Sequence, residues 1–322
     1  MKPLEIILLL ALPASGKSEV RKYLEHTLKG DAPSPFPMGE SVQLDDYPYV
    51  HLMRRIDDEL ALLGRSRLFF EAPDRSFVDG KNWGALIELL NEDFSDLETR
   101  TKPEPVKAAS WLFKRLDRAR LAVGADTVLE ALPGDVKVSL EEKLEAECRK
   151  LLKDKNQGIP ESLAGKTVVI EFARGGAQGS TMPLAEPFGY RYSLSRLSES
   201  ILSKASILYI WVTPEESRRK NFERADPNDP GSILHHGVPI AVMLNDYGCD
   251  DMEYLVETSG KPNTVKVKHE TKEFFLPVGR FDNRKDKTSF LRRAPETWTK
   301  EEIHQLEQGL LAAFSALASV RN

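Results

Sequence analysis

The residues with the most specific chemistry stand near the start of the chain, where Gly16, Lys17 and Ser18 close the segment ALPASGKS at positions 11–18. The spacing is close to the pattern G-x-x-x-x-G-K-S/T, in which backbone N–H groups curl around an anion at the start of a helix. Ala11 stands where the pattern has its first glycine, so the turn must close with Ala11 in an ordinary strand-like or helical conformation. We expect this segment to bind phosphate groups.

Each part of the segment has an expected role in binding a nucleoside triphosphate with magnesium. Gly16 allows close approach to a phosphate, Lys17 reaches the β and γ phosphates, and Ser18 holds Mg²⁺. The alternative is a chance Gly-Lys-Ser tripeptide in a turn, and the apolar run before it and the amphipathic stretch after it argue against that. The residues predicted to bind ATP are Ala11, Pro13, Ala14, Ser15, Gly16, Lys17, Ser18 and Glu19.

Acidic residues follow two further predicted strands. Asp45 and Asp46 come after a short strand predicted over 41–44, and Glu171 follows the apolar residues 168–170. Open α/β sheets place their ligands at the carboxyl ends of the strands. Asp45 or Asp46 could orient an acceptor hydroxyl and take its proton, and Glu171 could hold a magnesium-bound water. The alternative for all three is a solvated strand end, where Asp is common in turns.

Basic residues gather on a helix predicted over 214–224. Arg218, Arg219, Lys220 and Arg224 lie within two turns, and helical spacing prevents all four from pointing inward. Guanidinium groups suit the binding of phosphates, whereas a charged outer helix face is the alternative. The predicted catalytic residues are Lys17, Asp45, Asp46, Arg218 and Arg224, and the predicted metal ligands are Ser18 and Glu171.

The strands and helices that must position these residues alternate along much of the chain. Continuous apolar runs at 4–12, 166–173 and 206–213 are typical of strands buried on both faces of a parallel sheet. We therefore expect an α/β fold, in which helices cover both faces of a parallel sheet in three layers. The other predicted elements are helices over 18–29, 193–204, 214–224 and 300–320, and strands over 264–268 and 273–278.

A mainly helical segment interrupts this alternation. We expect residues 48–164 to form a helical substrate or partner lobe, and residues 1–47 and 165–322 to form the core. The loop predicted over 225–239 is long enough to serve as a lid. Within the lobe, helices are predicted near 49–63, 82–97, 104–122 and 139–154.

Composition and charge restrict the class of protein. With 41% hydrophobic and 30% charged residues, the 322-residue chain has the composition of a soluble globular protein. A formal net charge of −5 argues against a surface that binds duplex nucleic acid. Cys148 and Cys249 are too few for a disulfide scaffold. Glu5 interrupts the apolar N-terminal run that resembles a secretory signal, and no other stretch approaches the roughly 20 apolar residues of a membrane span. We expect a cytoplasmic protein without a membrane partner.

A weaker signal is the segment Asn283-Arg284-Lys285-Asp286, which matches the N-K/R-x-D pattern of guanine recognition. The match covers four residues, of which two are strict. Coincidence is the expected explanation, because short motifs often match by chance.

Together these motifs resemble the nucleoside and nucleotide kinase branch of P-loop proteins, most of all the uridine kinase and phosphoribulokinase group. The likeness is carried by ALPASGKS, LDDYPY, VVIEFARGG and the basic helix with its following loop, about a third of the chain. It implies a P-loop NTPase fold, an acidic residue at 45 or 46 that faces the phosphoryl acceptor, and arginines at 214–224 that close over the phosphates.

The resemblance also implies an activity. The expected protein is a kinase that uses Mg²⁺ and moves the γ-phosphoryl group of ATP to a small-molecule or nucleotide acceptor. The alternative is a P-loop NTPase that acts as a regulatory switch, with the helical lobe docking a protein partner. A kinase acting on polynucleotide ends is disfavoured by the acidic balance of the chain.

Overall fold

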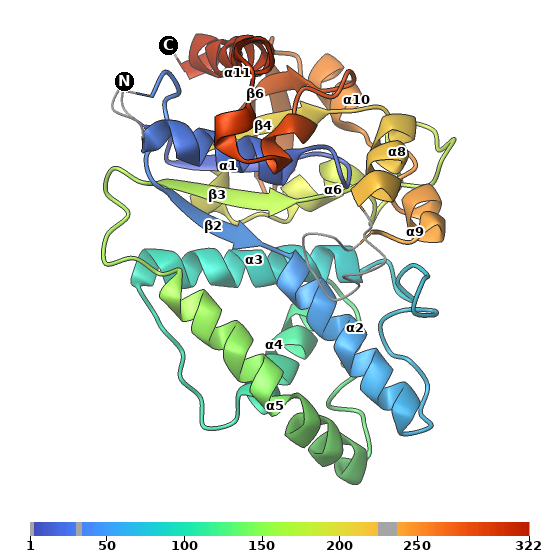
Figure 1. Cartoon of the computed structure of the whole chain (residues 1–322). Helices are drawn as coiled ribbons and strands as arrows, with labels where there is room; N and C mark the ends of the chain where they lie inside the picture. Colours follow the sequence, from blue (N-terminus) through green and yellow to red (C-terminus); the bar gives the residue numbers. More distant parts are fainter. Residues whose placement is uncertain (1–2, 30–33, 225–236, 322) are drawn as a thin grey trace.

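The structure is a computed structural model that describes residues 3–29, 34–224 and 237–321. In these ranges the chain forms a mixed α/β fold, with a six-stranded, mostly parallel sheet and eleven α-helices (Figure 1). The strand order is β2-β3-β1-β4-β6-β5, and β5 alone among these strands runs antiparallel to its neighbour. The strands are β1 (Ile6–Leu10), β2 (Ser41–Asp45), β3 (Thr167–Phe172), β4 (Ala205–Trp211), β5 (Thr264–His269) and β6 (Lys272–Asp282).

The apolar runs predicted as buried strands form the centre of this sheet. Every residue of β1 and of β3 is buried, as expected for strands covered on both faces. The run predicted as a short strand over 273–278 is the first half of the longer β6. Its residues 272–277 pair with β5 as a hairpin, and its residues 278–282 pair with β4 in parallel. One strand therefore joins the hairpin to the parallel sheet.

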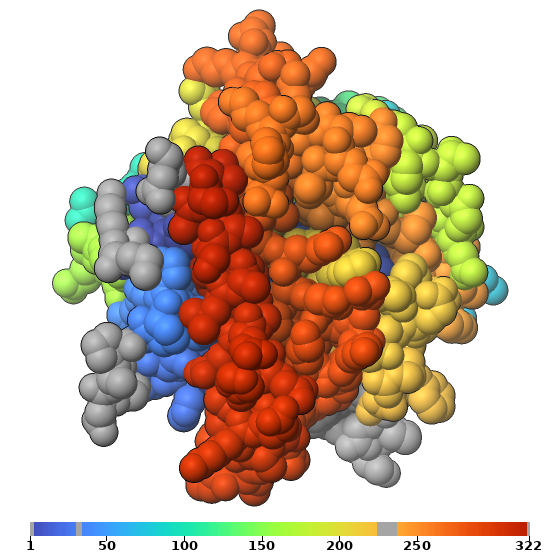
Figure 2. Space-filling model, turned by 90° about the horizontal axis from the view of Figure 1, so that it is seen from above, coloured from blue at the N-terminus to red at the C-terminus, as the bar shows by residue number. Residues whose placement is uncertain are grey.

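Helices cover both faces of the sheet because successive strand residues point to opposite sides. Ile7 and Leu9 pack against α1 (Lys17–Leu28) and α11 (Lys300–Arg321). In Figure 2, α11 forms a continuous ridge over this face. The residues Ile6 and Leu8 face the opposite layer. That layer is built from α3 (Asn82–Thr99), α6 (Gly189–Ser195), α7 (Glu199–Leu202) and α10 (Met252–Glu257).

Beyond the sheet lies a group of helices in which α3 is shared. Leu90 and Phe94 of α3 belong to the core beneath the sheet, whereas Leu86 and Leu89 belong to the core of the helical group. The two cores are thus continuous through one helix. The remaining helices of this group are α2 (Tyr47–Leu62), α4 (Ala108–Ala122) and α5 (Gly134–Gln157), and all were predicted within about five residues at each end.

The prediction of one continuous helix over 193–204 was wrong, because the chain forms two short helices there, α6 and α7. Ser198 adopts an extended conformation with φ −62° and ψ 152°. The Asn91 side chain accepts a hydrogen bond from the Ser198 amide at 2.9 Å and donates one to the Arg196 carbonyl at 2.8 Å. A tertiary contact therefore satisfies the backbone groups that a continuous helix would have paired internally.

The other elements lie around the carboxyl edge of the sheet and under α11. They are α8 (Pro214–Arg224), α9 (Ile240–Asn245), and the short 3₁₀ helices Ser289–Arg292 and Pro295–Thr297. Most of the loop predicted over 225–239 falls outside the described residues. Across the ranges that are described, no helix combines the length and the apolar character needed to cross a membrane.

Candidate functional site

The segment after β1 is a tight turn that leads directly into a helix. The chain leaves the central strand at Leu10 and enters α1 at Lys17. Gly16 has φ 99° and ψ 15°, and Ala14 has φ 53°. Ala11 is not among the described residues with positive φ, as predicted. The first N–H groups of α1 lack intrahelical partners, and they therefore point out at the carboxyl end of the sheet, where an anion is favoured.

Neighbouring segments hold this turn in place through its carbonyl groups. The Asn283 side-chain amide donates a hydrogen bond to the Ser15 carbonyl at 2.7 Å, and the Ser217 hydroxyl donates one to the Pro13 carbonyl at 2.7 Å. A Cβ atom on Gly16 would stand 2.4 Å from the Thr288 hydroxyl oxygen. Only glycine suits this position, both for its φ and for the close approach.

Lys17 bends back over the turn that precedes it. Its ammonium nitrogen lies 3.4 Å from the Ala11 carbonyl oxygen. Its positive charge also lowers the pKa of both Asp45 and Glu171, against the effect of their burial. Lys17 therefore contacts the turn, and its charge also acts on the carboxylates of Asp45 and Glu171.

Asp45 and Glu171 stand side by side on adjacent strands. Asp45 of β2 is in register with Glu171 of β3, which in turn is in register with Leu9 of β1. Residues in register share a face of the sheet, so both carboxylates lie on the side covered by α1. Burial raises the pKa of Asp45, and the charges of Glu171 and Asp46 raise it further. Burial likewise raises the pKa of Glu171, whereas Lys17 and Arg21 lower it.

Asp46 has a different environment from Asp45. The Arg174 guanidinium, 2% exposed, donates a hydrogen bond to the Asp46 carboxylate at 2.7 Å. The same guanidinium bonds to the Ser193 hydroxyl at 3.1 Å and lies over the ring of Trp83, 5.0 Å from its centroid. Arg174 is therefore a buried link between the start of α2, the end of β3 and α3. The Asp45 carboxylate, by contrast, accepts a hydrogen bond from the Tyr47 amide at 2.8 Å.

We expect Arg174→Met to lower the free energy of unfolding by about 3–5 kcal/mol, because it leaves Asp46 as a buried charge without its partner. The matched control is Arg118→Met, since Arg118 pairs with Glu92 but its side chain is 63% exposed. That control should cost less than about 1 kcal/mol. Urea unfolding of both variants measures the difference. Equal losses would contradict the buried role of Arg174.

The basic residues of α8 divide between three environments. Lys220 is fully buried and pairs with Asp286 at 2.6 Å. Arg219 pairs on the surface with Glu216. Arg218 is mostly buried, with 18% of its side chain exposed, and donates a hydrogen bond to Glu215 at 3.0 Å. Its Nη1 atom is buried without a hydrogen-bond partner in the described chain. Arg224 ends α8, and its side chain lies outside what the structure describes.

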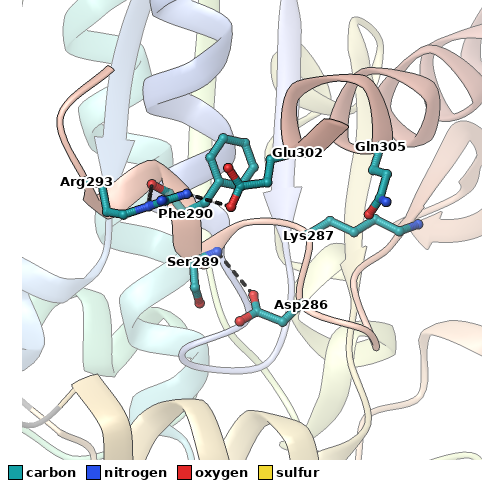
Figure 3. Close-up of a pocket in the computed structure, with 7 residues that line it drawn as sticks. All are labelled: Asp286, Lys287, Ser289, Phe290, Arg293, Glu302 and Gln305. Atoms are coloured by element: carbon teal, nitrogen blue, oxygen red, sulfur yellow. Dashed lines mark hydrogen bonds and ion pairs between the residues drawn. The ribbon is translucent and has the colours of Figure 1, made fainter. Parts of the chain in front are cut away.

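The side chains of Asn283 and Asp286 stabilise the conformation of the loop in which they lie. Asn283 is fully buried, and its side chain bonds to Ser15, Thr288 and Lys287. Asp286 pairs with Lys220, which holds the pKa of Asp286 near 2 although burial opposes this. Beyond Asp286 lies a cavity of about 390 Å³, where Arg293 pairs with Glu302 and the Ser289 amide bonds to Asp286 (Figure 3).

A nucleotide phosphate with Mg²⁺ fits the polar atoms around the turn. Ser15 Oγ and Glu171 Oε2 are buried without hydrogen-bond partners in the described chain, as is Arg218 Nη1. Such orphaned atoms are uncommon unless a ligand or solvent satisfies them. Within the described residues, no group of three or more His, Cys, Asp and Glu side chains could hold a metal ion by itself. Mg²⁺ at nucleotide sites takes only one or two protein ligands, with phosphates and water for the rest.

Arg21 was not among the predicted site residues. Its Nε atom lies 3.8 Å from Glu171 Oε2. The sequence did contain a signal, because Arg21 follows Lys17 by four residues and so shares its helix face. Of the predicted residues, the structure brings Lys17, Asp45 and Glu171 within electrostatic reach of each other, and it places Asp46 beside Arg174.

Comparison with known proteins finds no relative of this chain. No family model, no curated protein and no solved structure matches the chain.

Proposed function

We propose that the chain is a kinase that transfers the γ-phosphoryl group of ATP to the hydroxyl group of a small molecule. The observation that carries the proposal is that Asp45 is in register with Glu171, that Glu171 is in register with Leu9 of the strand before the turn, and that the charge of Lys17 acts on both carboxylates. Phosphoryl transfer needs a cation near the transferred group and a carboxylate that orients the attacking hydroxyl. The strand-turn-helix segment that begins with β1 offers the cation, and the end of β2, separated from β1 by β3, offers the carboxylate.

In this proposal the turn at 11–16 and the first residues of α1 hold the phosphates. The free N–H groups at the start of α1 favour anionic oxygens, and Lys17 adds a charge beside the β and γ phosphates. Ser18 and Glu171 would hold Mg²⁺, Glu171 through a water molecule. The metal ion, when bound, neutralises charge on the transferred phosphoryl group. Arg218, whose Nη1 atom is buried without a hydrogen-bond partner among the described residues, would pair with a phosphate oxygen in this proposal.

The contrast between the two neighbouring aspartates supports Asp45 as the base. Asp46 is engaged by the buried Arg174, so its part is to position the start of α2. The Asp45 carboxylate accepts a hydrogen bond from the Tyr47 amide, and its pKa is raised by burial and by the charge of Glu171. A raised pKa makes a carboxylate a stronger proton acceptor than an ordinary aspartate.

The test is acceptor-dependent consumption of ATP by the full chain. We expect ADP formation in the presence of Mg²⁺ to rise with particular alcohols, and phosphorus NMR to show an equal amount of a new phosphate monoester. The rival function predicts something else. If ATP turnover stayed constant across nucleosides, nucleotides and sugars but rose with a protein partner, a regulatory switch would replace the kinase.

A further inference from the structure

A second cavity, of about 470 Å³, lies between the sheet and the helical group. It opens between the end of β2, the start of α2 and the second half of α5, with α3 at its base. Asp45 is among the residues that line it, so the cavity adjoins the strand end whose carboxylate the proposed function assigns to the acceptor hydroxyl. This inference therefore rests on the proposed function and concerns the same site.

The floor of the cavity is apolar. Leu44, Leu52, Leu97 and Ile159 line it and are buried, and Leu151 completes the wall. An occupant with an apolar body would remove this surface from water, which favours binding by roughly 25 cal/mol for each Å² covered.

An aromatic pair stands at the end of the cavity near Asp45. The rings of Tyr47 and His51 are stacked, with centroids 6.3 Å apart and planes inclined by 27°. Both side chains are at least partly accessible. A flat ring of a ligand could lie against them while a hydroxyl group reaches Asp45.

The lining offers little free positive charge to a phosphorylated occupant. Four carboxyl groups and two ammonium groups line the cavity, and no arginine lines it. Two of the carboxylates pair with arginines outside the lining, Asp93 with Arg115 at 2.6 Å and Glu147 with Arg55 at 3.2 Å, and burial raises the pKa of Asp45. One of the ammonium groups, Lys155, already pairs with Asp93 at 3.3 Å and with Asp96. Sites for phosphate esters commonly use arginine forks or free lysines. The four carboxylates belong to Asp45, Asp93, Glu147 and Asp154.

We propose that this cavity binds the acceptor, and that the acceptor is an unphosphorylated alcohol with an apolar body rather than a nucleotide or a sugar phosphate. In the reaction the acceptor oxygen forms a bond to the γ-phosphorus. The bond from that phosphorus to the β,γ-bridging oxygen breaks, and ADP leaves. The hydroxyl proton passes to the Asp45 carboxylate.

The proposal is tested with 2-phenylethanol and its phosphate monoester, which differ only in the phosphate group. Methyl NMR of the full chain should show shifts at Leu44, Leu52, Leu97, Leu151 and Ile159 with the alcohol at millimolar concentration. The monoester should bind at least about tenfold more weakly, because no arginine lines the cavity and one of its two lysines is already paired. Shifts elsewhere with the alcohol, no shifts at all, or equal binding of the monoester would each overturn the proposal.

Two pairs of variants sharpen this test. Asp154→Lys should strengthen binding of the monoester relative to the alcohol by about threefold or more, whereas Glu142→Lys, exposed on the same helix and outside the cavity, should leave the ratio unchanged. Leu151→Trp should fill the cavity and abolish the methyl shifts. Its control, Leu121→Trp, replaces a leucine that is 56% exposed and does not line the cavity.

Failure of this inference can be told from failure of the proposed function. Binding of the alcohol is measured without nucleotide, and binding of ATP with Mg²⁺ is measured without the alcohol. If ATP binds and acceptor-dependent transfer occurs but the monoester occupies the cavity as well as the alcohol does, the kinase survives and the acceptor class is wrong. If the alcohol binds and ATP does not, the kinase proposal is wrong.

Discussion

Replacing Asp45 with asparagine is expected to lower the rate of phosphoryl transfer by about 100-fold to 10,000-fold while the affinity for ATP with Mg²⁺ stays within about threefold. Asparagine keeps the shape of the side chain and can still accept the hydrogen bond from the Tyr47 amide. It cannot take a proton from the acceptor. Single-turnover transfer and equilibrium titration of ATP, measured on the same preparation, separate the two effects.

The control for this variant is the neighbouring residue. Asp46→Asn removes the negative charge that pairs with a buried guanidinium, so it should lower stability by about 3–5 kcal/mol and reduce transfer much less than Asp45→Asn does in the fraction that remains folded. If Asp46→Asn abolished transfer and Asp45→Asn did not, the assignment of the two aspartates would be reversed.

The same carboxylate predicts a direction for the pH dependence of transfer. Burial raises the pKa of Asp45, and the charges of Glu171 and Asp46 add to this. The base acts in its ionised form, so transfer should rise with pH through an inflection well above the value of about 3.9 typical of aspartate. In Asp45→Asn this inflection should be absent.

The free energy of unfolding should change with pH in the opposite direction to the rate of transfer. The folded chain holds the Asp45 proton more tightly than the unfolded chain, so this group lowers the free energy of unfolding as pH rises from the unfolded pKa to the folded pKa. Asp45→Asn should therefore be more stable than the wild type at the upper end of that range. Urea unfolding at several pH values measures the gain, and a variant that lost stability as pH rose in the same way as the wild type would contradict it.

The second large effect is expected from Lys17→Ala. Loss of the ammonium group should slow transfer by about 100-fold or more, because a charge beside the transferred phosphoryl group is missing in the transition state. It should also weaken ATP binding. Lys22→Ala is the matched control, since Lys22 lies on the same helix and its ammonium group is 3.4 Å from the Leu291 carbonyl. Comparable losses of transfer rate in the two variants would mean that the ammonium group of Lys17 does not act on the transferred phosphoryl group.

The sequence predicts the elements that carry the candidate site because local patterns determine them. β1 is a run of five apolar residues, α1 follows with Val20, Tyr23 and Leu24 on one buried face, and Gly16 joins them. Period and turn chemistry are sufficient to place such elements. The mainly parallel sheet followed from the same runs. The P-loop NTPase fold and the separate lobe at 48–164 are predictions that need a matching protein or a dissection of the chain.

The sequence does not predict which side chains meet across the fold. The sequence around Arg174 indicates no partner for it, and it is buried against Asp46, Ser193 and Trp83. Lys220 belonged to a basic helix, yet it pairs with Asp286, 66 positions further along the chain (286 − 220 = 66). These contacts depend on how distant elements pack. No local pattern contains that information, because helical spacing gives the face of a residue but not its partner.

The central claim is that the turn before Lys17 holds the phosphates of ATP, and calorimetric titration of the full chain with ATP tests it most directly. We expect saturable binding that requires Mg²⁺, that persists in Asp45→Asn and that is strongly weakened in Lys17→Ala. No binding heat at millimolar ATP with Mg²⁺, at two temperatures, would contradict the claim.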